Sequence, residues 1–201
     1  MKSLLVTPIL ILLFCLQHIS AQNISDLEAY EKAMKPGTVL TYDVSMGGKQ
    51  YKLIVTLKKV GDEIAFDWKT TEPANKSGTV VMSAAAVKTA DALFGYFAGG
   101  NSNLEKETSL FISKKEFDDV AANAEALFKM NGAADTATRM SNTIGEFNFN
   151  LNGNLIAVPA WELEGGSEIK YKLFAIESRQ FPLIVQMNLG WSMVLTEIKE
   201  P

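Results

Sequence analysis

The sequence has one cysteine and one histidine, Cys15 and His18, and both lie near its N-terminus. Without that segment the chain cannot use a cysteine nucleophile, a Ser-His-Asp triad or a histidine base. It also lacks the usual zinc ligands and cannot form a disulfide. We therefore predict a protein that is not an enzyme, with no metal site and no cofactor.

Arginine is almost absent as well, since Arg139 and Arg179 are the only two. The formal net charge is −4, and removal of Lys2 with an export signal makes it −5. Nucleic acids require a basic surface, and phosphate sites are commonly built from arginine. The composition argues against both kinds of ligand.

Residues 1–21 have the features of a secretory signal peptide. The basic Lys2 is followed by an apolar run over residues 4–16, and then by Ser20-Ala21 before a plausible cleavage point. We expect an exported protein, periplasmic or extracellular. The remaining residues, 22–201, are expected to form a single β-rich domain, because about 180 residues can enclose one good core.

Two alternatives apply to the same segment. A membrane anchor needs about 20 apolar residues, and this run is shorter, so we expect a chain that does not span a membrane. A bacterial lipidation signal at Cys15 would need small residues just before it, where the chain has Leu13-Phe14.

The clearest pattern runs from Phe181 to Ile198, where every second residue from Leu183 to Leu195 is apolar. A period of two is typical of a strand with one buried face. A three-residue loop, residues 188–190, preserves this alternation and pairs Met187 with Trp191. The pattern predicts two strands, about 182–187 and 191–198; one long bent strand is the alternative.

Similar alternation recurs along the rest of the chain, with Gly-containing turns between the segments. We predict a mainly β fold with about eleven antiparallel strands in an up-and-down barrel or half-barrel. A two-sheet β-sandwich is the alternative. A return strand near Asp135 to Met140 has few apolar residues and is expected to be an edge or an exposed strand, within an edge near 133–145, and Pro159 predicts an edge or bulge.

Two or three short helices are expected to pack on this sheet. Capping-box spacing predicts one from Ser25 to Lys35 and another after Ser113. Apolar residues at helical spacing predict a third over residues 83–97, which we expect to lie against the sheet.

The stretches Gly37-Thr38-Val39-Leu40-Thr41-Tyr42 and Phe181-Pro182-Leu183-Ile184-Val185 enter the first and last hairpins. Here the chain resembles a class of exported bacterial envelope proteins that form curled or incomplete β-barrels. A related architecture carries lipid or lipoprotein, so the resemblance implies an apolar cavity. It implies no catalytic residues, and it does not cover the predicted helices at 83–97 and after 113.

Large aromatic side chains are the candidate ligand-binding residues, because small-molecule pockets are mostly apolar and aromatic. Each could instead fill the core. Tyr96 is the candidate for a polar contact, since it ends a predicted helix beside a Gly-rich loop. The candidates are Trp68, Tyr96, Phe97, Trp161 and Trp191.

Three functions remain open from the sequence. The first is a non-catalytic envelope protein that binds a lipid or another apolar or amphipathic small molecule. The second is a structural or assembly protein that contacts an envelope protein partner, through the edge near 133–145. The third is a hydrolase that uses two carboxylates, for which Asp62-Glu63 and Asp118-Asp119 are candidate pairs.

Overall fold

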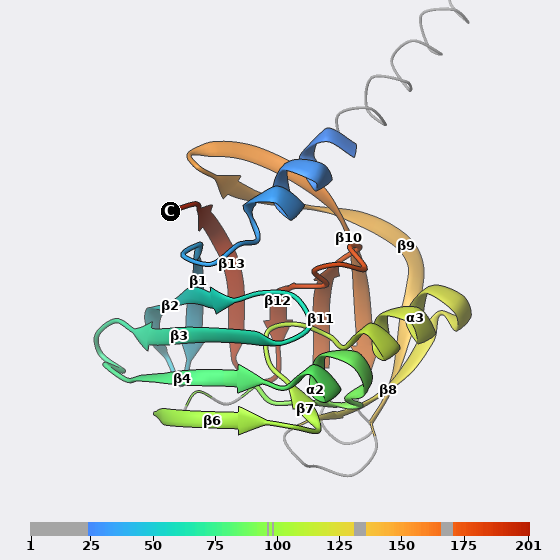
Figure 1. The fold of residues 1–201 in the computed structure, drawn as a ribbon, viewed down its shortest axis with the longest axis horizontal. Coiled ribbons are helices and arrows are strands. Elements are labelled where there is room, and N and C mark those ends of the chain that lie inside the picture. The colour runs from blue at the N-terminus through green and yellow to red at the C-terminus, as the bar shows by residue number, and fades with distance from the viewer. Residues whose placement is uncertain (1–23, 96, 98, 131–135, 166–170) are drawn as a thin grey trace, which may run out of the picture.

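The computed structural model describes residues 24–201, except 96, 98, 131–135 and 166–170. The predicted export signal, residues 1–21, lies outside the described part. The described chain forms a curled sheet with short helices on it (Figure 1). Its helices are residues 24–33, α2 (Ala84–Thr89) and α3 (Lys114–Asn123). Its strands are β1 (Val39–Met46), β2 (Lys49–Lys59), β3 (Ile64–Thr70), β4 (Ser77–Met82), β5 (Ala92–Leu93), β6 (Gly100–Leu104), β7 (Glu107–Thr108), β8 (Glu125–Met130), β9 (Thr136–Leu151), β10 (Asn154–Gly165), β11 (Tyr171–Ile176), β12 (Ile184–Asn188) and β13 (Ser192–Lys199).

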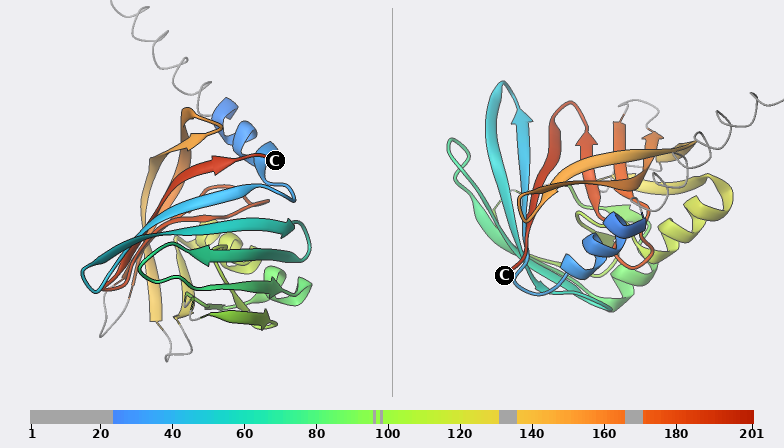
Figure 2. Two further views of the ribbon diagram at one scale, coloured as in Figure 1. Left: turned by 90° about the vertical axis from the view of Figure 1, so that its left-hand side faces the viewer. Right: turned by 90° about the horizontal axis from the view of Figure 1, so that it is seen from above.

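The sheet closes on itself in its C-terminal half. Its strand order is β6-β4-β3-β2-β1-β13-β12-β11-β10-β9-β8-β5-β7, and β13 also pairs with β9, through Glu197 opposite Asn150 and Ile198 opposite Leu151. This pairing closes β9 to β13 into a five-strand barrel, and β1 to β4 extend from it as a curved wall (Figure 2). The prediction of a mainly β protein with a barrel is confirmed.

The sheet is not antiparallel throughout. Strands β4 and β6 pair in parallel, as do β5 and β7, β5 and β8, and β13 and β9. The prediction of an all-antiparallel, up-and-down arrangement is therefore wrong at these pairs. Parallel neighbours need a long crossover, and the stretch through α2 and β5 supplies one between β4 and β6.

The closing hairpin is present, with a register two residues from the predicted one. Met187 lies opposite Met193, and Leu189, Gly190 and Trp191 form the turn. Gly190 has φ +76°, a left-handed conformation that glycine adopts without strain. Because a shift of two residues keeps every side chain on its own face, Met187, Met193 and Leu195 are all buried as the alternation predicts.

The helix predicted over residues 83–97 is shorter than expected. Ser83 caps it, but α2 ends at Thr89 and Ala90 leaves the helical conformation. Beyond it the backbone finds strand partners: the amide of Lys129 donates to the carbonyl of Asp91 at 2.9 Å, and the amide of Phe94 donates to the carbonyl of Thr108 at 2.7 Å. Tertiary pairing here overrides the helical spacing of the apolar residues.

The predicted edge at 133–145 is an edge only in part of the stretch that the structure describes. Residues 136–145 belong to β9, a single long strand that continues to Leu151. β9 pairs with β10 on one side, and β8 covers its other side only from Thr136 to Arg139. No strand of the described chain pairs with that side over residues 140–145. A shortage of apolar side chains shows that the faces of a strand are polar. An edge is instead defined by missing backbone partners, and these depend on the topology of the sheet.

Pro159 lies in β10, opposite Glu146 of β9 and one residue before the pairing with β11 begins at Ala160. Its carbonyl accepts from the amide of Glu177 at 2.9 Å, one residue beyond the end of β11 at Ile176. A proline ring is tolerated there because no strand residue opposes its missing N–H group. The prediction of an edge or bulge fits this position: among the described residues, β10 has no strand neighbour on that side until Ala160 pairs with Ile176, and a bulge follows between Trp161 and Leu163.

The N-terminal helix, residues 24–33, covers one end of the sheet (Figures 1 and 2). Tyr30 is fully buried, and its ring meets Phe149 edge-on with centroids 6.2 Å apart. The Asp26 carboxylate accepts from the amide of Ala157 at 3.0 Å. Ser25 lies within the helix, so the predicted capping box does not form there.

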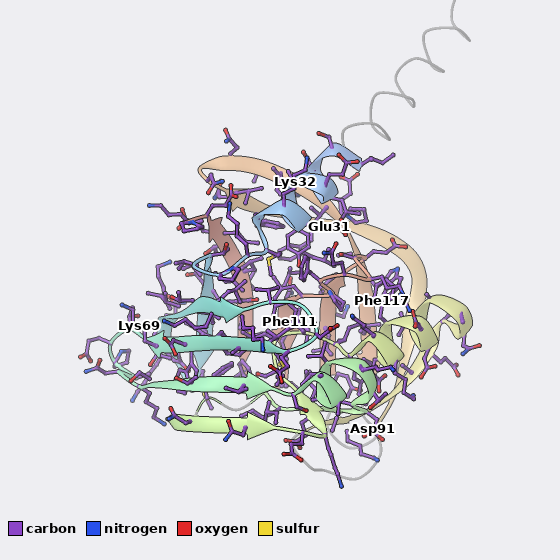
Figure 3. The ribbon with its side chains drawn as sticks, viewed as in Figure 1. Glu31, Lys32, Lys69, Asp91, Phe111 and Phe117 are labelled. Carbon is purple, nitrogen blue, oxygen red and sulfur yellow. The ribbon has the colours of Figure 1, made fainter. Side chains whose placement is uncertain are left out.

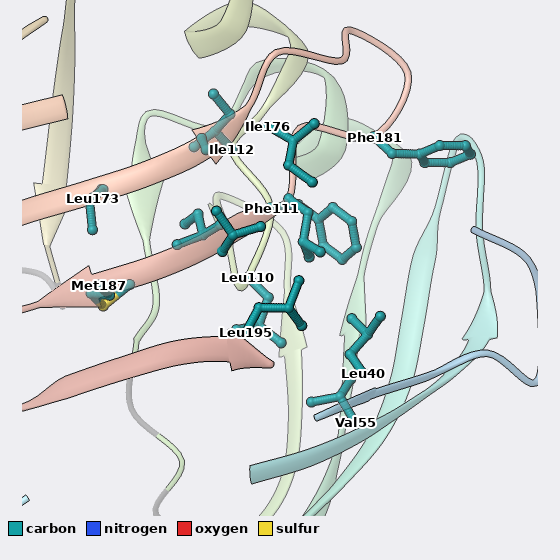
Figure 4. Packing of buried hydrophobic residues seen from close by; sticks show 14 of the residues in the cluster. Leu40, Val55, Leu110, Phe111, Ile112, Leu173, Ile176, Phe181, Met187 and Leu195 are labelled. Carbon is teal, nitrogen blue, oxygen red and sulfur yellow. The ribbon is translucent and has the colours of Figure 1, made fainter. Parts of the chain in front are cut away.

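The concave side of the sheet is filled by an inward loop. The amide of Ile184 donates to the carbonyl of Leu110 at 2.7 Å, and Phe111 forms an isolated bridge with Leu183. Leu110 and Phe111 lie among Leu40, Val55 and Leu195 of β1, β2 and β13 (Figure 4). Figure 3 shows Phe111 deep within the side chains.

Candidate functional site

A pocket of about 340 Å³ lies on the concave side of the wall, next to this filled core. Its floor is made by Val44, Leu53 and Met193 of β1, β2 and β13. Val44 pairs with Met193, and Leu53 pairs with Tyr42. The floor is therefore formed by the same inward-facing rows of side chains that form the neighbouring core. The volume falls within the range of about 300–1,000 Å³ that is typical of small-molecule sites.

Aromatic side chains form a second part of the pocket. Phe97 and Trp191 line it, and both are half-buried. The ring of Trp68 lies behind Phe97, with centroids 5.1 Å apart and planes at 67°. An edge-to-face contact of this kind fixes the orientation of Phe97 at the wall.

The loop after β3 forms a third part of the wall, where Pro73 and Ala74 line the pocket. The amide of Thr71 donates to the carbonyl of Lys52 at 2.9 Å, and the amide of Lys52 donates to the Thr71 hydroxyl at 2.9 Å. The amide of Ala74 donates to the carbonyl of Thr71 at 3.2 Å. These bonds hold the loop against β2, so the loop has a fixed position in the pocket wall.

Three polar side chains line the rim of the pocket: Lys49, Tyr51 and Lys76. The Tyr51 hydroxyl lies 3.7 Å from the sulfur of Met46, a weak acceptor. Partial burial raises the pKa of Tyr51, so the hydroxyl keeps its proton as a donor. The rim therefore offers two ammonium groups and a hydroxyl to whatever occupies the pocket.

The structure places the predicted site residues in different regions. Phe97 and Trp191 both line the pocket. Trp68, which is only 4% exposed, contacts Phe97 from the core. Trp161 is buried elsewhere, against Phe117 of α3, with ring centroids 4.5 Å apart. Tyr96, predicted as the polar contact, lies outside the described residues.

The polar rim was not predicted from the sequence, although the position of Lys49 could have been recognised from the strand pattern. The inner row of β2 continues backwards from Leu57, Val55, Leu53 and Tyr51 to Lys49. A lysine at a position that the alternation assigns to the inner face is unusual, and it marks the end of the apolar row. Lys76 has no such signal, because it lies in a loop whose path depends on tertiary contacts.

The candidate catalytic carboxylates are on the surface. The side chain of Asp62 is 96% exposed, and Glu63 pairs with Lys59. Asp118 forms a two-pronged pair with Arg179, at 2.7 and 2.8 Å, and this pair holds the pKa of Asp118 below its usual range. These carboxylates lie outside the pocket.

One carboxyl group of the described chain is buried without a hydrogen-bond partner. Glu116 is 2% exposed, and neither of its side-chain oxygens is hydrogen-bonded. Its amide donates to the hydroxyl of Ser113, the predicted cap of α3, at 3.1 Å, so half of the capping box forms. Burial raises the pKa of Glu116 to about 8.

Among the described residues, no group of three or more His, Cys, Asp or Glu side chains is arranged to hold a metal ion. The described helices are too short or too polar to cross a membrane. No family model, curated protein or solved structure matches the chain. The resemblance to exported envelope proteins therefore stays a prediction.

Proposed function

We propose that this chain is an exported, non-catalytic protein that binds a small apolar or amphipathic molecule in the pocket beside Phe97 and Trp191. The carrying observation is the cavity itself, about 340 Å³, with an apolar floor on the inner face of a curved sheet. An apolar ligand gains free energy from leaving water at such a surface, by roughly 25 cal/mol per Å² buried.

The position of the pocket supports binding over catalysis. Leu110 and Phe111 fill the neighbouring part of the concave side, and the pocket lies next to this filled part. The pocket wall contributes aromatic, aliphatic and lysine side chains. Ligand sites are typically of this composition, with a few polar groups that fix orientation.

Binding can be tested with N-phenyl-1-naphthylamine, an uncharged dye whose fluorescence increases in apolar sites. We expect saturable binding of one dye per chain. Ala74→Trp places an indole at the pocket wall and is expected to weaken dye binding at least tenfold. The matched control is Ala85→Trp, which adds the same group to the exposed side of α2.

Unchanged binding in Ala74→Trp, or equal loss in both variants, would contradict the assignment of the site. Native mass spectrometry of protein purified gently from its source, followed by organic extraction, gives the second test. A small apolar molecule bound one per chain supports the proposal. Failure of both the dye and any native molecule to bind would refute it.

A further inference from the structure

We infer that the ligand is an anionic amphiphile, with one acidic group held by Lys49 and Lys76 and an apolar body beside Phe97. This inference rests on the proposed function. It concerns the chemistry of the ligand's head group, which the apolar floor by itself does not specify.

Lys49 is placed at the pocket by strand geometry. The inner row of β2 runs through Tyr51, Leu53, Val55 and Leu57, and Lys49 is its first member. In β1, β2 and β3, each described in full, the other inner positions of this wall are aliphatic, aromatic, Met or Thr. A single ammonium group at the end of such a row gives the pocket a charged end and an apolar end.

Lys76 is held at the same rim by Thr70, which also lines the pocket. The amide of Lys76 donates to the Thr70 hydroxyl at 2.8 Å, and the amide of Thr70 donates to the carbonyl of Lys76 at 2.8 Å. This reciprocal pair fixes the backbone of Lys76, so a flexible side chain extends from a fixed point beside the pocket.

The charges of the two rim lysines are not balanced within the described chain. On the outer face, Lys52 pairs with Asp43 at 2.7 Å and Lys58 pairs with Asp67 at 3.0 Å, whereas Lys69 forms no ion pair in the described chain. Neither Lys49 nor Lys76 forms an ion pair in the described part of the chain, and no described Asp or Glu lines the pocket. An acidic group on the ligand would supply the missing negative charge.

The Tyr51 hydroxyl adds a donor between these charges and the floor. Its neighbour along the inner row is Lys49, and the acceptor within reach of its hydroxyl is the sulfur of Met46. A carboxylate or phosphate oxygen is a much stronger acceptor than a thioether. The rim thus offers both ammonium and hydroxyl donors to one acidic head group.

The test compares two probes that differ only at the head group, decanoic acid and decanol, by isothermal titration at pH 8 and low salt. We expect decanoate to bind at least tenfold more tightly than decanol, a difference of about 1.4 kcal/mol. The preference should decrease as salt rises, because the lysines are exposed.

The charge-removing variant is Lys49→Met together with Lys76→Met. It is expected to bind decanol as the wild type does and to lose most of the preference for decanoate. Lys69→Met is the matched control, because Lys69 is an exposed lysine on the outer face of β3 (Figure 3) and should keep the preference. Decyl phosphate serves as a second anion and distinguishes a phosphate head group from a carboxylate.

The outcomes separate this inference from the proposed function. Tighter binding of either anion than of decanol, lost in the double variant, supports the inference. Equal affinity for acid and alcohol, or an unchanged preference in the double variant, overturns it while decanol or dye binding still supports the pocket. If neither decyl probe binds but the naphthylamine dye does, the anionic head group is likewise refuted.

Discussion

The hydroxyl of Tyr42 in β1 donates a hydrogen bond to the carbonyl of Ile184 in β12, at 3.0 Å and across 142 residues of sequence. The two strands are not neighbours, because β13 lies between them in the sheet. Tyr30 makes a similar bond, at 2.7 Å, to the carbonyl of Phe181. Burial raises the pKa of both tyrosines, so both remain protonated donors. Together they fix the chain that enters the last hairpin.

Tyr42→Phe is expected to lower the free energy of unfolding by about 1–2 kcal/mol, because the Ile184 carbonyl loses a buried partner. Urea denaturation measures the loss. Tyr51→Phe is the control: its hydroxyl contacts a Met sulfur near the surface, and its removal should cost less than about 0.5 kcal/mol. Equal losses in the two variants would show that the buried bond is not important.

Asn152 joins the β9–β10 turn to the C-terminus. Its side chain accepts from the amide of Glu200 at 2.9 Å and donates to the Glu200 carboxylate at 2.7 Å, and its backbone has φ +52°. Asn152→Ala should cost about 1–2 kcal/mol, because it removes both bonds and places a Cβ-bearing residue without local support in a left-handed conformation.

Asn152→Gly separates these two causes, since glycine adopts the left-handed conformation freely. It should lose less stability than Asn152→Ala in the same urea titration. Hydrogen exchange of the Asn152 amide, which donates to the Ile198 carbonyl at 2.9 Å, should increase in both variants. A larger loss of stability for Asn152→Gly than for Asn152→Ala would show that backbone strain is not the main cause of the loss.

Glu116 should make the stability of the protein depend on pH. Its pKa is about 8 in the folded chain, against about 4.3 for an unperturbed glutamate. The folded state therefore holds the proton more tightly, so the contribution of Glu116 to stability is fully present below about pH 4.3 and is lost as the pH rises towards 8.

Glu116→Gln removes this titration. The free energy of unfolding of the variant, relative to wild type, should be higher at pH 9 than at pH 5 by at least about 1.4 kcal/mol, the value of one pKa unit. The control is Glu105→Gln at an exposed position, which should show no such trend. Parallel pH profiles for Glu116→Gln and wild type would contradict the assignment.

Phe97→Ala should weaken binding of N-phenyl-1-naphthylamine at least fivefold, because Phe97 forms part of the pocket wall and its ring rests on Trp68. Phe147→Ala is the matched control. Phe147 is also half-buried and pairs with one aromatic ring, Phe174, at 6.4 Å, away from the pocket. Comparable affinity in the two variants would mean that Phe97 does not contact the dye.

Much of the fold followed from local pattern. Alternation identified the faces of β1, β2, β3 and the closing hairpin, because strand side chains point to opposite sides in turn. Ser113 and its spacing to Glu116 identified the start of α3, because a helix leaves its first amides without partners. These signals are short in range, and the residues that produce them are close in sequence.

The candidate site was found only in part. The aromatic class led to Phe97 and Trp191, which line the pocket, but the same reasoning led to Trp161, which packs against Phe117 in the core. A tryptophan in a core and a tryptophan in a pocket have the same local pattern. What separates them is the set of side chains opposite, and that set comes from other strands.

By itself the sequence determined which residues face inward in β1, β2, β3 and the closing hairpin, because the side chains of a strand point to its two faces in turn. The tertiary structure alone decided that residues 91–94 do not continue α2 but pair with β7 and β8. It also decided that β13 pairs with β9 and closes the barrel, and that Lys49 and Lys76 meet at one pocket. These outcomes depend on backbone partners and side chains far apart in the chain, and local spacing carries no information about such distant pairs.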